Sequence, residues 1–165
     1  MKQDMLEELY RSCAGQVYLY ALSLCKDPHQ AEELTSDTFY KALLCLEEER
    51  EGVKYWLLKV CRNLFLDRAR RQRRRKELPL EEEWLTGQGQ DNPLEEYLQN
   101  EERQALYRAL LRLPPFDREL LTMFYFAGCG TAQIASLTGK TPGAVKTGLS
   151  RARIRLKKGL EEEWK

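Results

Sequence analysis

Apolar residues recur every three or four positions at the start of the chain, which is the spacing of amphipathic helices. A first stripe runs from Leu6 to Leu24, and Asp27 then offers a cap for a second helix with Pro28 at its first position. This second helix is expected to end at about Leu46. Its expected apolar face is made of Ala31, Leu34, Thr38, Phe39, Ala42 and Leu43.

A third helix is expected over residues 53–75, and it ends in a strongly basic stretch. Seven of the nine residues from Arg68 to Lys76 are lysine or arginine. Positive charges stabilise a helix C-terminus, but seven of them also repel one another. The stretch therefore favours a polyanionic partner over a merely solvated surface.

The middle of the chain has a different character. Residues 77–100 contain seven acidic residues and no lysine or arginine, whereas the sequences before and after them have net charges of +3 and +5. Proline, two glycines and the absence of a helical stripe indicate a linker at residues 77–92. The sequence thus predicts an all-α protein in which a flexible acidic linker joins two small helical domains, residues 1–76 and 93–165.

The last third of the chain predicts a helix-turn-helix. Helices are expected over residues 93–113 and 116–127, separated by two prolines. Thr131 can cap a short helix, Gly139 can make a tight turn, and Thr141 can cap a second helix. Such a hairpin also occurs in helical bundles that bind no DNA, so the pattern alone leaves both interpretations open.

The final helix separates its side chains into two faces. Val145, Leu149, Ala152 and Leu156 share one narrow arc and are expected to pack inward. The opposite face carries hydroxyl and basic side chains, which reach base edges and phosphates when a helix enters the major groove of DNA. Its residues are Lys146, Thr147, Ser150, Arg151, Arg153 and Lys157.

Other functions find little support in the sequence. The longest apolar runs are too short for a membrane span, and no signal peptide begins the chain, so a cytoplasmic protein without membrane insertion is expected. Five widely spaced cysteines and one histidine do not form the close pairs that hold metals, and we expect the cysteines to pack in the core. The sequence contains no catalytic motif, so no metal, cofactor or enzymatic activity is predicted.

Three segments, in this order, resemble the extracytoplasmic-function (ECF) sigma factors of the sigma-70 family. They are AEELTSDTFYKAL at residues 31–43, YWLLKVCRNLFLD with the arginine run at residues 55–76, and LPPFDRELL with the helix-turn-helix from residue 113 onward. The resemblance implies a subunit that binds core RNA polymerase and directs it to promoter DNA. It further allows an anti-sigma factor as a protein partner.

The resemblance assigns roles to individual residues. It places Glu33, Asp37, Phe39 and Lys41 against core polymerase. It places Asn63, Arg70, Arg71 and Arg74 at the minus-ten element. It places Lys146, Thr147, Ser150, Arg151 and Arg153 at the minus-thirty-five element, while Gly148 stands where many members have an arginine.

Two other functions remain open at this point. A stand-alone helix-turn-helix regulator would leave the segment at residues 31–43 and the two-domain organisation unexplained. An interaction protein could bind polymerase or a sigma regulator without reading promoters. The acidic linker could line basic channels of the polymerase or serve only as a soluble tether.

Overall fold

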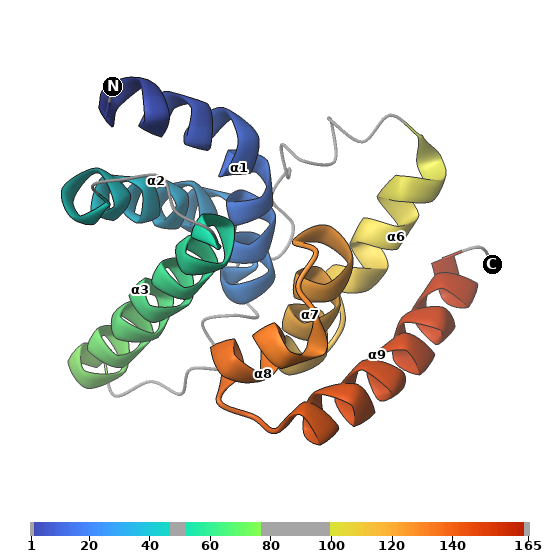
Figure 1. Ribbon diagram of the computed structural model, residues 1–165. Coiled ribbons are helices and arrows are strands. Elements are labelled where there is room, and N and C mark those ends of the chain that lie inside the picture. Colours follow the sequence, from blue (N-terminus) through green and yellow to red (C-terminus); the bar gives the residue numbers. More distant parts are fainter. Residues whose placement is uncertain (1, 47–51, 77–99, 164–165) are drawn as a thin grey trace. The chain divides into compact units, whose positions relative to one another are not determined.

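The computed structural model describes residues 2–46, 52–76 and 100–163, and every regular element in these segments is a helix (Figure 1). The chain divides into two compact units, residues 1–88 and 89–165, which are described separately below. The prediction of an all-α fold with two helical domains, the second a helix-turn-helix, is confirmed. The predicted linker at residues 77–92 and the start of the helix expected at residue 93 lie outside the described residues.

The first unit is a three-helix arrangement in which each helix packs against the other two. The chain reverses between the first two helices because Lys26 adopts a left-handed conformation (φ 61°) and Asp27 accepts a hydrogen bond from the backbone N–H of His29 at 2.9 Å. Tyr20, Leu34 and Leu58 are at most 1% exposed at the centre of the core. The helices are α1 (Lys2–Cys25), α2 (Pro28–Cys45) and α3 (Val53–Lys76).

The buried face of α2 is narrower than the sequence predicts. Ala31, Leu34, Thr38 and Ala42 are buried, and the Thr38 hydroxyl donates to the Leu34 carbonyl at 2.7 Å, so burial leaves it hydrogen-bonded. Leu43 was expected on this face, and that expectation is wrong because its side chain is 48% exposed. Ala42 and Leu46, on either side of Leu43 in the sequence, are buried, so Leu43 lies off the buried stripe.

The second unit is organised around its long last helix, which packs against α6, α7 and α8. Its core includes Leu120, Leu121, Ile134 and Leu149, all at most 2% exposed. Figure 1 shows this last helix in red, running beside the shorter helices of the unit. The elements are α6 (Glu101–Leu111), α7 (Pro115–Leu121), a π-helical turn (Thr122–Phe126), α8 (Thr131–Thr138) and α9 (Pro142–Glu163).

The π-helical turn corrects the uniform helix expected over residues 116–127. Here the Ala127 N–H donates to the carbonyl of Thr122, five residues earlier, at 3.1 Å, instead of to the residue four earlier. The wider turn buries Met123 completely while leaving Tyr125 56% exposed. Such single π turns often occur at functional sites.

Two helix caps and one tight turn define the helix-turn-helix. Gly130, not Thr131 as expected, is the N-cap of α8, and the Gln133 side chain accepts a hydrogen bond from the Gly130 N–H at 3.0 Å. Gly139 makes the turn with φ 74°, a conformation that glycine adopts without strain. The prediction for Thr141 is confirmed, because its hydroxyl accepts from the Ala144 N–H at 3.1 Å and caps α9.

Four of the five cysteines are buried, as the packing interpretation predicts, and Cys45 is exposed. Within the described segments, none of the helices combines the length and the apolar content that a bilayer span requires.

Candidate nucleic-acid and protein interfaces

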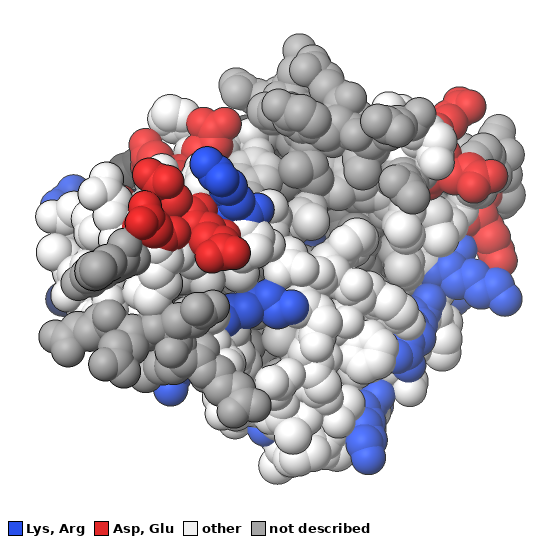
Figure 2. Space-filling view, turned by 45° about the horizontal axis from the view of Figure 1, so that its top comes forward, with Lys and Arg blue, Asp and Glu red and all other residues white. Residues whose placement is uncertain are grey.

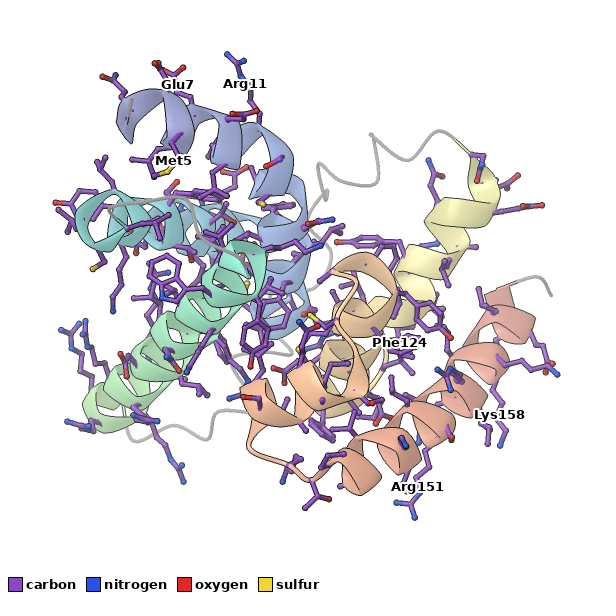
Figure 3. The ribbon with its side chains drawn as sticks, in the orientation of Figure 1. Met5, Glu7, Arg11, Phe124, Arg151 and Lys158 are labelled. Carbon is purple, nitrogen blue, oxygen red and sulfur yellow. The ribbon has the colours of Figure 1, made fainter. Side chains whose placement is uncertain are left out.

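The polar face of α9 is a basic surface of the second unit. Val145, Leu149 and Ala152 are buried beneath it, as their spacing predicts, whereas Leu156 is only half-buried. Figure 2 shows lysine and arginine side chains along this helix, and in Figure 3 Arg151 projects away from the rest of the unit. The exposed candidates are Lys146, Thr147, Ser150, Arg151 and Arg153. A rigid helix thus presents hydroxyl and basic groups on the side opposite its core contacts.

Two arginines at the borders of this face are held by neighbouring elements. Arg155 pairs with the carboxylate of Asp117 at the start of α7, so its charge is balanced within the unit. Arg153 donates its Nε–H to the hydroxyl of Tyr125 at 2.8 Å, and its guanidinium carbon lies 5.3 Å from the centroid of the Phe124 ring. Sequence reasoning missed Tyr125 because the π turn that directs it toward α9 has no recognisable motif.

Gly148 belongs to the packed side of α9. A Cβ at this position would approach Leu120 Cδ1 to 2.7 Å and Phe116 Cε2 to 3.7 Å. The glycine therefore permits close contact between α9 and α7. The position is set apart from the exposed basic residues, next to the interface with α7.

The basic end of α3 offers a second charged surface. Asn63, Arg70, Arg71 and Arg74 are all exposed. Asn63, Arg70 and Arg74 follow one another at steps of seven and four, so they share one side of the helix. Arg70 also lies 3.5 Å from Asp67, one turn earlier, an exposed pair that is worth little in water.

On α2, three of the four candidate polymerase contacts are exposed to solvent. Glu33, Asp37 and Lys41 are exposed, whereas Phe39 is half-buried. The Phe39 ring meets Tyr10 of α1 edge to face, with ring centroids 4.9 Å apart. Phe39 therefore contributes to the packing of α1 on α2 as well as to the surface.

Arg68 connects the acidic residues of α2 with the basic helix α3. It pairs with the carboxylate of Asp37, and its Nη1 lies 3.7 Å from Oε2 of Glu33. His29 Nε2 lies 3.3 Å from Oε1 of the same Glu33. The two carboxylates thus lie beside each other on the surface, next to the Arg68 guanidinium.

Apolar residues extend this α2 surface in a way that sequence reasoning missed. Tyr40 and Leu44 are 62% and 63% exposed, and Leu43 lies beside them. Leu43 also lines a mostly apolar groove of about 320 Å³ with Leu6, Tyr10 and Phe39, between α1 and α2. Glu7 and Arg11 of α1, which Figure 3 labels, also line this groove. The sequence did carry a sign of this exposed apolar surface. Leu43, Leu44 and Cys45 are consecutive apolar residues, and consecutive helical residues cannot all face one core.

The described chemistry is that of binding. The surfaces consist of exposed arginines and lysines, a pair of neighbouring carboxylates and exposed apolar side chains. These groups recognise nucleic acids and proteins, by phosphate neutralisation in the first case and by charge and apolar contact in the second.

Comparisons with known proteins agree with this two-unit organisation. The family models for sigma-70 region 2 and for sigma-70 region 4 match residues 9–75 and 103–156. The chain is 29% identical to the ECF RNA polymerase sigma factor SigM of Bacillus subtilis, and the match covers 96% of this chain and 99% of SigM. It is 31% identical to ECF sigma factor SigE of Mycolicibacterium smegmatis over 92% of this chain but 60% of SigE. The chain therefore spans less than two thirds of some of its relatives.

Solved structures share the fold. The sigma factor RpoE of Bartonella quintana, crystallised with the anti-sigma factor NepR, matches with a TM-score of 0.69 and 24% identity over 94% of this chain and 96% of RpoE. CnrH, solved with the cytosolic domain of CnrY, matches with a TM-score of 0.63 and 18% identity over 97% of this chain and 90% of CnrH. With both sigma-70 regions present in order, the chain belongs to the sigma-70 family, among its ECF sigma factors.

Proposed function

We propose that this chain binds core RNA polymerase and directs it to specific promoters. The observation that carries the proposal is that one chain combines two parts. They are a sigma-70 region 2 helix trio and a capped helix-turn-helix whose last helix exposes a row of hydroxyl and basic side chains. A stand-alone regulator would need only the second unit. Catalysis belongs to the polymerase, and the chain acts in the cytoplasm, where the polymerase works.

Each unit has its own task in this proposal. Residues 1–76 dock on polymerase through Glu33, Asp37, Phe39 and Lys41, with the exposed apolar surface of α2 beside them. Residues 93–165 place α9 in the major groove at the minus-thirty-five element. The acidic linker at residues 77–92 joins the two. The proposed DNA-binding residues of α9 are Lys146, Thr147, Ser150, Arg151 and Arg153.

The end of α3 acts on the melted DNA. Arg70, Arg71 and Arg74 hold the phosphate backbone at the minus-ten element, and Asn63 meets the unpaired strand. Unstacking a base costs a few kcal/mol, which contacts to the open strand offset. Melting is then stabilised because the protein binds the single strand more tightly than the duplex.

Run-off transcription tests the proposal directly. Purified core polymerase and fragmented genomic DNA from the source organism are combined with and without the protein, and discrete new transcripts are expected. Asp37→Arg and Lys146→Glu should abolish them, the first by losing polymerase binding and the second by losing promoter binding. The charge-matched controls Glu8→Arg and Lys158→Glu alter exposed residues outside the proposed contacts and should leave the transcripts in place.

An anti-sigma factor is a second proposed partner. The apolar groove between α1 and α2 and the exposed Tyr40 and Leu44 favour a protein ligand on this unit, and the RpoE and CnrH structures were solved with protein partners. Copurification from cells of the source organism, followed by competition with core polymerase, tests this partner. Simultaneous binding of both proteins would contradict a shared surface.

A further inference from the structure

Arg153 is the α9 arginine that is held by aromatic side chains of the π turn. Its Nε–H donates to the Tyr125 hydroxyl at 2.8 Å, and its guanidinium carbon lies 5.3 Å and 5.7 Å from the ring centroids of Phe124 and Tyr125. The two rings also meet each other edge to face, 5.0 Å apart. The guanidinium is therefore held by an aromatic pair that the π turn presents to α9.

The charge of Arg153 is not balanced within the described part of the unit. Arg155, two residues later, pairs with Asp117, but no carboxylate among residues 100–163 pairs with Arg153. A guanidinium has five N–H donors, and the bond to Tyr125 uses one of them. The two terminal nitrogens remain for an anionic ligand, and an arginine fork matches phosphate geometry.

Tyr125 can contribute a donor of its own to the same ligand. Its oxygen accepts the bond from Arg153, which leaves the hydroxyl proton for another acceptor. The side chain is 56% exposed, so a ligand can reach it. Tyr125 and Arg153 together thus offer a fixed positive charge and several hydrogen-bond donors at one point.

The position of this pair indicates which anion it meets. Lys146, Ser150, Arg153 and Lys157 follow one another at steps of four, three and four, so Arg153 lies in one row of the polar face of α9. It is at the border of that face, against the π turn, and a helix in the major groove meets the DNA backbone at its borders.

We propose that Tyr125 and Arg153 form a phosphate site on the DNA backbone beside the recognition helix. Tyr125 is its positioning residue and a second donor, and Arg153 neutralises the phosphate without reading a base. This inference rests on the proposed function, since it assumes that α9 binds DNA. It adds Tyr125 to the DNA interface. It also assigns a role to the π turn, which places Tyr125 beside Arg153.

The test measures binding of the full-length protein to a random-sequence DNA duplex by fluorescence anisotropy across a series of salt concentrations. Arg153→Ala should lower the slope of log affinity against log salt by about one, because one phosphate contact is lost. Tyr125→Phe should weaken binding severalfold in the wild-type background and have no further effect in the Arg153→Ala background. Phe126→Leu is the matched control, since Phe126 is a half-exposed aromatic of the same π turn, and should leave affinity unchanged.

Three outcomes would overturn the phosphate site. The first is that Arg153→Ala leaves the slope of log affinity against log salt unchanged. The second is that Tyr125→Phe lowers affinity equally with and without Arg153, and the third is that the protein does not bind the duplex at low salt. A loss seen only on one DNA sequence would show that Arg153 reads a base. The measurement uses no polymerase, so its failure is distinct from a failure to produce transcripts. Thermal unfolding of each variant separates lost contacts from lost folding.

Discussion

Gly148 of α9 and Leu120 of α7 are in such close contact that a Cβ on the glycine would come within 2.7 Å of Leu120 Cδ1. Leu120 is fully buried, so its side chain has little room to move away. The glycine therefore sets the distance between the recognition helix and the helix behind it.

Because of this contact, we expect alanine substitution to have opposite effects on stability at two glycines of α9. Gly148→Ala should lower the free energy of unfolding by about 1 kcal/mol, because overpacking outweighs the gain in helix propensity. Gly159→Ala is the matched control, since its Cβ would lie 3.6 Å from Ala109 Cβ in ordinary contact, and it should stabilise by about 0.5–1 kcal/mol. Denaturant unfolding checks both, and equal effects at the two positions would contradict the steric argument.

Tyr18 should make the stability of the first unit sensitive to alkaline pH. Burial, and to a lesser extent the negative charge of Glu32, raises the pKa of Tyr18 from 10.0 to about 12. The folded state thus keeps the proton longer than the unfolded state, so the stability is complete below about pH 10 and falls as the pH rises toward about 12. Tyr18→Phe should flatten this decline, as measured by unfolding at several pH values.

The same substitution has a consequence at neutral pH. The Tyr18 hydroxyl is buried without a hydrogen-bond partner in the described structure. Removing it should leave the protein at least as stable, because an unsatisfied buried hydroxyl opposes folding. Tyr40→Phe, at an exposed position, controls for the loss of a hydroxyl, and a marked destabilisation by Tyr18→Phe would show that the group is hydrogen-bonded after all.

Thr141 should matter for DNA binding although it need not touch DNA. Its hydroxyl caps the first turn of α9, directly before Lys146 and Thr147. Thr141→Ala should cost about 1 kcal/mol of stability and weaken promoter binding by fraying that turn. Thr141→Ser keeps the cap and should restore both, as thermal unfolding and a promoter-binding assay would reveal; failure of serine to rescue would point to another role for threonine.

Arg68 and Asp37 should be coupled in stability, but weakly. Both side chains are partly exposed, at 31% and 52%, so water and salt screen the pair. A double-mutant cycle with Arg68→Ala and Asp37→Ala should give about 0.5 kcal/mol at low salt and less at high salt. The more exposed Arg70–Asp67 pair provides the comparison and should give a smaller coupling energy. A coupling energy larger for Arg70–Asp67 than for Arg68–Asp37 would contradict the role of Arg68 as the link between α2 and α3.

The sequence by itself determined the features that depend on neighbouring residues. Asp27 and Thr141 cap their helices as predicted because a cap is made within three residues of chain. The inward position of Val145 and Leu149 followed from helical periodicity alone. The family followed from three ordered segments and needed no coordinates.

Only the tertiary structure decided which residues from distant segments meet. The exposure of Leu43 depends on how α1 and α3 cover α2, and the need for Gly148 depends on how close α7 approaches. The π turn that brings Tyr125 to Arg153 joins residues 28 positions apart and leaves no periodic signal in either segment. Local propensity selects helices and caps, whereas contacts of this kind arise from the packing of complete helices against one another.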